Sequence, residues 1–216
     1  MNTNKPLEHR TFSFEIRAEE GENGEKIITG RPIVYEKTTD IGPFDEVIAR
    51  GALDGADLTD VRFLVNHNTE MIPLARSRRN NGNSTMLLSP DFEGLAIRVR
   101  LDVENNVDAR ALYSAVSRGD ITGMSFMFTV NEVTWSDVDS EHPKRRIDKF
   151  DRIIELSACT FPAYEDTEIN ARSLEAALES ARSALESARK EAEKRSEVDT
   201  SADIELALLK EKIKLK

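Results

Sequence analysis

The last 46 residues differ so sharply from the rest of the chain that they confine the folded domain to what precedes them. From Ala171 to Lys216 there is no glycine, proline or aromatic residue, and 20 of the 46 residues are charged. Such a segment can be helical, but it has too little apolar surface to build a core of its own. Because every aromatic residue and every glycine lies in residues 1–170, the core must be built there.

Apolar residues in this tail recur at alternating steps of four and three, which is typical of a coiled-coil seam. The seam comprises Leu174, Leu178, Ala181, Leu185, Ala188 and Ala192. A second helical piece is expected over 204–215, after a polar stretch from Glu197 to Asp203 that suits a helix break and a new N-cap. We predict a charged helical tail over 171–216, which is either a solvated helix or a coiled-coil or docking segment that orders against a partner.

The formal net charge of −10 is concentrated in the first 170 residues, because the tail carries 10 basic and 10 acidic residues. Binding to nucleic acid phosphates depends on a surplus of lysine and arginine, so no direct nucleic-acid partner is expected. A single cysteine, Cys159, and three dispersed histidines exclude a disulfide scaffold and a structural zinc site. Apolar runs are too short for a membrane span and the N-terminus is polar, so we expect a cytoplasmic protein without a membrane partner.

Residues 10–170 read as short strands with one or two helices. Polar and apolar residues alternate around Phe12, Phe14 and Ile16 and over 95–101, and β-branched residues are frequent over 26–35. Residues 106–118 have apolar residues at helical spacing and are followed by Gly119, a typical C-terminal helix glycine. We therefore predict an α+β domain over 10–170 with a mainly antiparallel, barrel-like sheet, preceded by a flexible segment over 1–9.

The run from Ile121 to Val130 presents the first candidate for chemistry. If it is a strand, Met124, Phe126 and Phe128 face the core, and Ser125 projects from the opposite face beside Gly123. The second glycine of the α/β-hydrolase nucleophile elbow is absent, because Met127 stands there. Ser125 is therefore either a serine on the less apolar face of a strand or a nucleophile, depending on whether a base lies beside it.

Three histidines are available as that base. His9 lies in the polar N-terminal segment and His142 in the charged loop over 137–146, so both are expected to be exposed. His67 differs, because it follows the strand-like run 61–65 at the start of a turn, where a side chain is held by rigid structure and still reachable by substrate. The alternative for His67 is a turn histidine bonded to backbone.

Glu155 is the candidate for the orienting acid. It stands inside the apolar run over 152–161, and a carboxylate in such a strand must find a partner or shift its pKa. A histidine that becomes charged during acyl transfer would be that partner, and Arg152 or Arg62 would be the alternative. The rivals for the acid role are Asp151, Asp148 and His142.

Seven short blocks, in this order, resemble the HK97-type prohead maturation proteases of tailed bacteriophages, serine proteases with a fold similar to the herpesvirus assemblins. The blocks are Phe44 to Leu53, Val65 to Asn68, Pro73 to Arg76, Glu93 to Leu95, Gly123 to Phe128, Glu155 to Ser157, and Phe161 to Tyr164. The match covers about residues 10–170, and no block falls in the tail. Asn68, Ala75 and Met127 depart from residues common in the family, which bears on substrate preference more than on activity.

This resemblance implies Ser125 as the nucleophile, His67 as the general base and Glu155 as the orienting acid, with no metal or organic cofactor. It also implies the fold of the assemblins, the capsid protein precursor or scaffold as substrate, self-cleavage, association with further copies, and action inside the assembling procapsid in the host cytoplasm. Arg76 is a candidate for holding the oxyanion or is a surface ion pair. A different class is a non-catalytic assembly module that acts through the helical tail.

Overall fold

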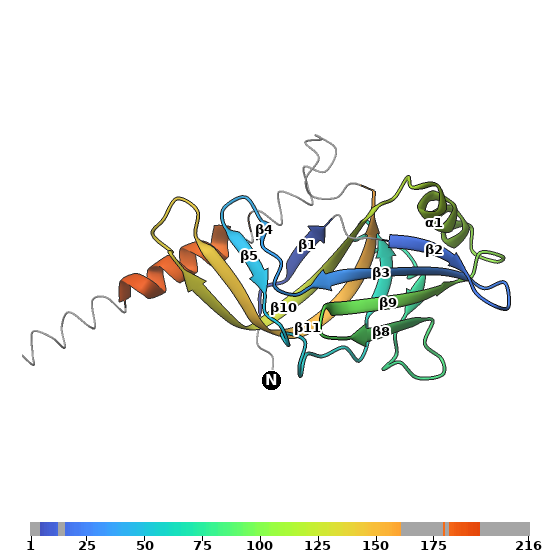
Figure 1. The fold of residues 1–216 in the computed structure, drawn as a ribbon, viewed down its shortest axis with the longest axis horizontal. Helices are drawn as coiled ribbons and strands as arrows, with labels where there is room; N and C mark the ends of the chain where they lie inside the picture. The colour runs from blue at the N-terminus through green and yellow to red at the C-terminus, as the bar shows by residue number, and fades with distance from the viewer. Residues whose placement is uncertain (1–4, 13–15, 161–178, 180–181, 195–216) are drawn as a thin grey trace, which may run out of the picture.

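Strands make up most of the regular structure (Figure 1). The computed structural model describes residues 5–12, 16–160, 179 and 182–194. In chain order the elements are β1 (Glu8–Phe12), β2 (Ile16–Glu20), β3 (Lys26–Val34), β4 (Thr39–Asp40), β5 (Asp45–Ile48), β6 (Arg62–Val65), β7 (Ala75–Arg76), β8 (Met86–Pro90), β9 (Gly94–Leu101), α1 (Val107–Arg118), β10 (Gly123–Ser136) and β11 (Lys144–Cys159). A further helix spans residues 182–194. The predicted α+β class is confirmed.

The strands form two sheets. The first runs β1-β10-β11-β5-β4, with β6 also paired to β11 and β7 to β6, and the second runs β2-β3-β9-β8. The pairs are antiparallel except for β11 with β5 and with β6, so the prediction of a mainly antiparallel sheet is confirmed. One end of the 16-residue β11 pairs with β5 and the other with β6, so this strand links the two regions of the first sheet.

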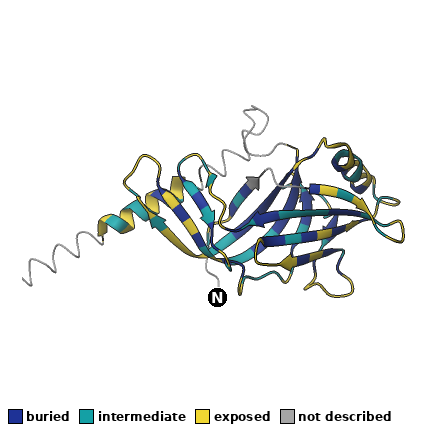
Figure 2. Ribbon diagram, in the orientation of Figure 1, coloured by how far each residue is buried: buried dark blue, intermediate teal, exposed yellow. Residues whose placement is uncertain are grey.

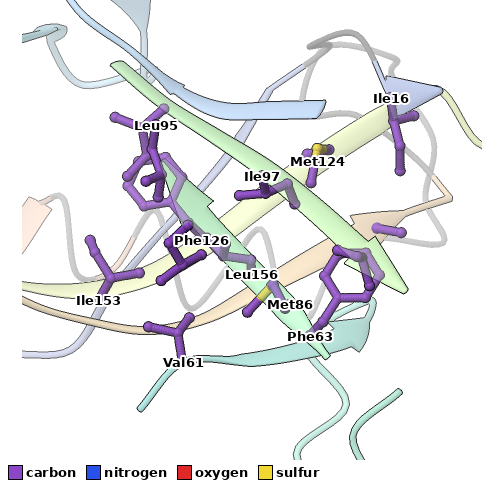
Figure 3. Packing of buried hydrophobic residues seen from close by; sticks show 14 of the residues in the cluster. Ile16, Val61, Phe63, Met86, Leu95, Ile97, Met124, Phe126, Ile153 and Leu156 are labelled. Carbon is purple, nitrogen blue, oxygen red and sulfur yellow. The ribbon is translucent and has the colours of Figure 1, made fainter. Parts of the chain in front are cut away.

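The core lies between the sheets. Met124 and Phe126 of β10, with Leu156 of β11, face Leu95 and Ile97 of β9 (Figure 3). All of these side chains are buried, and each contributes about 1.5–3 kcal/mol relative to an exposed position. The alternation predicted for residues 124–128 is confirmed, since its apolar face is the core face. Burial decreases along β10 toward Ser136, where the β10–β11 hairpin extends away from the core (Figure 2).

Helix α1 confirms the helix predicted over 106–118. The Asn106 side chain accepts hydrogen bonds from the backbone N–H groups of Asp108 and Ala109, at 2.9 and 3.2 Å, which satisfies two donors of the first turn. Gly119 ends the helix in the left-handed region, with φ of 78°. The helix packs against β2 at the edge of the second sheet.

Three local predictions were wrong. Of the single strand expected around 12–16, Phe12 belongs to β1 and Ile16 to β2, which lie in different sheets, and residues 13–15 lie outside the described residues. The loop expected over 137–146 is shorter, because β11 begins at Lys144. Glu8 and His9, assigned to a flexible segment, lie in β1, because Glu8 forms buried ion pairs that local sequence does not reveal.

The helix over residues 182–194 packs against the β10–β11 hairpin. Leu185 is buried against Phe44, and Trp135 packs against the same pair. Arg189 Nε donates to the Val138 carbonyl at 2.9 Å. The tail seam is described only from Leu185 onward; Leu174, Leu178, Ala181 and the piece over 204–215 lie outside the described residues. In the part of the chain that the structure describes, no helix is long and apolar enough to cross a membrane.

Candidate active site

Ser125 lies in β10 on the face turned away from the core, as its place in the alternation predicts. Its backbone position is opposite Ser157 of β11 on one side and Thr11 of β1 on the other. The side chain is fully buried, with an exposed fraction of 0%. The Oγ atom lies 2.5 Å from Nε2 of His67 and 2.7 Å from the Arg10 carbonyl oxygen. The structure therefore brings Ser125 to a base separated from it by 58 residues.

His67 is held by an unusual turn at the end of β6. Asn66 and His67 both have positive φ, 50° and 55°, and the Asn68 N–H donates to the Val65 carbonyl at 3.1 Å. Asparagine tolerates this left-handed conformation better than most residues. Its side-chain amide exchanges two hydrogen bonds with Thr160, at 3.0 and 2.9 Å. The His67 N–H donates to Ser157 Oγ at 3.1 Å. These contacts hold the backbone of the turn and so fix the position from which the imidazole extends.

We expect Asn66→Ala to misplace His67. The substitution removes two hydrogen bonds to Thr160 and puts a residue poorly suited to positive φ in the turn, a loss of about 1–3 kcal/mol in the free energy of unfolding. The free energy of unfolding, measured with denaturant, and kcat, measured on the same preparation, should both be lower than in the wild type. Asn68→Ala is the matched control, because the Asn68 carboxamide oxygen only accepts the Glu70 N–H on the exposed side of the turn. Equal effects of the two variants would contradict the role given to Asn66.

Glu155 completes the group from β11. Its side chain is 1% exposed, and its Oε1 is hydrogen-bonded to Nδ1 of His67. Ser157 Oγ donates to the other oxygen, Oε2, at 2.6 Å. A carboxylate only accepts hydrogen bonds, so Nδ1 carries the hydrogen and the lone pair of Nε2 faces Ser125. Register explains the meeting, since Glu155 and Ser157 lie in the part of β11 that pairs with β6, the strand leading into the His67 turn.

The rivals for the acid role lie elsewhere. Asp151 is bound by Lys5 and Thr129, at 2.7 and 2.9 Å, and Asp148 accepts from Thr134 at 2.6 Å. His142 is exposed, as predicted, and contacts Asp45 at 3.0 Å. Arg76, a candidate for the oxyanion, forms a two-bond ion pair with Asp60 at 2.5 and 2.8 Å. That contact corresponds to the surface ion pair weighed as its alternative role.

His9 is a residue of this site that the sequence placed wrongly on the surface. It lies in β1 opposite Met127, and its ring is edge-on to the His67 ring at a centroid distance of 4.9 Å. Burial, reinforced by the nearby His67, lowers the pKa of His9 from 6.5 to about 4. His9, His67 and Glu155 offer one ligand atom each within 4.8 Å of one another, but both ring nitrogens of His67 already contact Glu155 and Ser125. Only the pairing of β1 with β10, between distant segments, could have revealed this placement.

Acid should destabilise the protein through His9. Its pKa of about 4 in the folded state lies below the ordinary 6.5, so the folded state resists protonation. The stabilisation from neutral His9 is complete above about pH 6.5 and is lost as the pH falls toward 4. The melting temperature of the wild type should therefore fall more steeply over this interval than that of His9→Asn. If the melting temperatures of the two proteins depend on pH in the same way, the lowered pKa of His9 is refuted.

Cys159 lies next to the site in β11 and is buried. Burial, together with the nearby Glu155 carboxylate, raises the pKa of its thiol to about 12. The thiolate is the nucleophilic form of cysteine, and it is essentially absent at neutral pH under these conditions. Among the described groups around His67, the hydroxyl of Ser125 is therefore the better candidate for a nucleophile.

These contacts form an unbroken line from the Ser125 hydroxyl through the His67 imidazole to the Glu155 carboxylate. Serine hydrolases use this arrangement for acyl transfer, and it is recognised by geometry and not by chain order. The α+β fold and this line of side chains define a candidate serine hydrolase. The family model described as caudovirus prohead serine protease matches residues 12–180, and the chain belongs to this family. It is thus a serine protease of capsid maturation, which confirms the resemblance seen in the sequence.

Comparison with solved structures finds the capsid assembly protease gp21 of bacteriophage T4. The two chains share 12% sequence identity with a TM-score of 0.37, and the alignment covers 70% of this chain and 98% of that chain. No curated protein matches this chain.

Proposed function

We propose that the protein is a serine endopeptidase that cleaves the capsid protein precursor or its scaffold segment, and also itself, with Ser125 as nucleophile. The observation that carries this assignment is the 2.5 Å contact between Ser125 Oγ and His67 Nε2, continued by the hydrogen bond from His67 to Glu155. A serine hydroxyl becomes a useful nucleophile when such a base takes its proton.

In the first step His67 accepts the Ser125 proton through Nε2 while Oγ attacks a peptide carbonyl. The imidazolium then donates this proton to the leaving amine. In the second half of the reaction, His67 takes a proton from the water that attacks the acyl-enzyme and returns it to Ser125 Oγ as the product leaves. Glu155 keeps the hydrogen on Nδ1 and stabilises the positive charge that develops on the ring. Because Glu155 is almost fully buried, little solvent screens this charge interaction.

Membership of the family supports the place and the partners proposed for the protein. The substrate is presented inside the assembling procapsid in the host cytoplasm, where copies of the enzyme lie close together and self-cleavage between copies becomes possible. The acidic net charge of the chain disfavours a nucleic-acid partner. The helical tail is the segment through which the enzyme would associate with the shell or with further copies.

Co-expression with the capsid protein precursor tests the function. Wild-type enzyme should produce shortened capsid protein and self-cleavage fragments, and Ser125→Ala should produce neither. Cleavage by both proteins would remove Ser125 from the mechanism. Absence of cleavage in both, with the enzyme retained in procapsids, would support the non-catalytic assembly module instead.

A further inference from the structure

Strand β1 covers the nucleophile. It runs antiparallel to β10 at the edge of the first sheet, with Thr11 opposite Ser125 and Arg10 opposite Phe126 (Figure 1). Ser125 is fully buried in this arrangement, and His9 of β1 packs edge-on against His67. A peptide substrate cannot lie along this stretch of β10 while β1 is paired there, because an edge strand offers one row of backbone groups.

The contact with β1 also gives the Ser125 hydrogen a second acceptor besides the base. Ser125 Oγ donates to the Arg10 carbonyl oxygen at 2.7 Å. A hydroxyl has one hydrogen, so while it is given to Arg10 it cannot be given to Nε2 of His67. Proton transfer to His67 is the step that activates the serine. The structure therefore represents a resting arrangement in which the three side chains are assembled and the Arg10 carbonyl competes with His67 for the Ser125 hydrogen.

Strand β1 is held by a buried group of four charges rather than by apolar contacts alone. The Arg10 guanidinium binds Glu46 of β5 at 2.5 and 2.7 Å, and Arg145 of β11 binds the Glu8 carboxylate with two bonds of 2.7 Å. Arg145 also donates to Glu46 at 2.6 Å. Each of the four side chains is only 2% exposed. Two of these residues belong to β1, and two belong to the body of the protein.

Charges buried this deeply must be matched. Burial alone would raise the pKa of Glu46, but Arg10 and Arg145 together hold it below its usual value. Removing one partner of a buried ion pair leaves the other uncompensated, which is strongly unfavourable. Glu46 and Arg145 therefore select what can pair with β10: a segment with an acidic residue facing Arg145 and, two positions later, a basic residue facing Glu46. Both then lie on the same side of an extended strand.

Resting on the proposed function, we propose that the β10 edge with Glu46 and Arg145 is a peptide-binding site for extended segments of the pattern Glu-x-Arg, and that β1 occupies it as a tethered inhibitor. The occupant seen in the structure is residues 8–10 of the chain itself, Glu8-His9-Arg10. Peptide binding by strand addition draws its affinity from backbone hydrogen bonds and its specificity from alternate side chains, and the four charges supply the latter.

The test exchanges the two charges of β1 in the full chain, as Glu8→Arg with Arg10→Glu. Like charges then face each other at both positions, so β1 should leave the β10 edge while Glu46 and Arg145 stay in place. The readout is the labelling rate of Ser125 by a fluorophosphonate probe, with Ser125→Ala as the blank. We expect labelling at least about 10-fold faster than in the wild type, which corresponds to about 1.4 kcal/mol. A folded exchange variant that labels no faster than the wild type would overturn the proposal.

Synthetic peptides provide the matched control. A peptide with the sequence of residues 5–12 should protect the exchange variant from the probe, whereas the same peptide with Glu8 and Arg10 interchanged should not. Equal protection by both would refute the Glu-x-Arg selectivity. Adding Glu46→Arg and Arg145→Glu to the exchange variant places opposite charges against each other again, so labelling of Ser125 should return to the slow wild-type rate. Continued fast labelling of that folded variant counts against the proposal.

A measurement on the wild type covers the case in which the exchange variant fails to fold. Once Ser125 carries the probe, the amides of residues 8–12 should exchange hydrogen faster than before labelling, and those of β8 should be unchanged. Unchanged exchange in β1 would show that Ser125 is reached with β1 in place, which refutes the inhibitor and leaves the nucleophile standing. No labelling of Ser125 in any variant would instead overturn the proposed function, and this proposal with it.

Discussion

Ser125→Ala is expected to reduce kcat for peptide hydrolysis by about 10⁴-fold or more, the range seen when a serine nucleophile is removed from an intact triad. The loss should appear in kcat and far less in KM, because the hydroxyl acts on the reacting carbonyl and contributes little to binding the rest of the substrate. A cleavable peptide derived from the capsid protein precursor and single-turnover kinetics would measure it directly. The variant should also fail to accumulate an acyl-enzyme detectable by intact mass.

Ser77→Ala is the matched control for this prediction. Ser77 is likewise fully buried, and its hydroxyl accepts the Val61 N–H at 3.1 Å, away from His67 and Glu155. Its loss removes the same atom from the same depth of burial without touching the candidate site. Activity should therefore persist in Ser77→Ala, apart from any loss of folded protein seen in its melting curve. Comparable inactivation of both variants would show that the effect of Ser125→Ala is structural.

Glu155→Gln should lower kcat by about 10⁴-fold, because it reverses the tautomer of His67. The Ser157 hydroxyl donates at the Oε2 position, so it keeps the amide oxygen of the new side chain there. The amide NH₂ then faces Nδ1 of His67, which must accept a hydrogen bond and can no longer carry a hydrogen. Nε2 carries the hydrogen instead and cannot take the proton of Ser125. Steady-state kinetics, supported by nitrogen NMR of the imidazole, would detect both effects.

The contribution of Ser157 can be separated in a double variant. Ser157→Ala in the Glu155→Gln background releases the amide to rotate, so that its oxygen can again face Nδ1 and part of the activity should return. Activity that falls further in the double variant would contradict the tautomer argument and leave simple loss of charge as the reason. Circular dichroism would establish that each variant is folded.

Local pattern predicted the individual candidates of the site but not their meeting. Alternation along residues 124–128 placed Ser125 on the face opposite the core, and turn residues placed His67 at the end of a strand. Glu155 was singled out because a carboxylate inside an apolar run demands a partner. That partner is set by the parallel pairing of β11 with β6 and the antiparallel pairing of β10 with β11, which depend on contacts between distant segments. The family resemblance supplied what the spacing could not.

The N-terminal strand shows where local reasoning fails. The segment before Arg10 is polar, which is typical of a flexible end, and its histidine was accordingly expected in solvent. In the structure, Glu8 and Arg10 are buried because Glu46 and Arg145, which lie 36 and 137 residues away from their partners Arg10 and Glu8, complete their charges. From the sequence alone, a charged residue of such a buried group cannot be told from an exposed one. Its burial depends on oppositely charged partners that lie far away along the chain.

The left-handed turn at Asn66 and His67 has a consequence for anyone who would rebuild this site in another protein. Copying the side chains of Ser125, His67 and Glu155 without this turn would leave the imidazole without its orientation, because the backbone at His67 adopts a conformation that most sequences avoid. The unit to be transferred is larger: it includes Asn66, its hydrogen-bond partner Thr160, and Ser157, whose hydroxyl accepts the His67 N–H. A transplant lacking those neighbours would reproduce the composition of the site and lose its alignment.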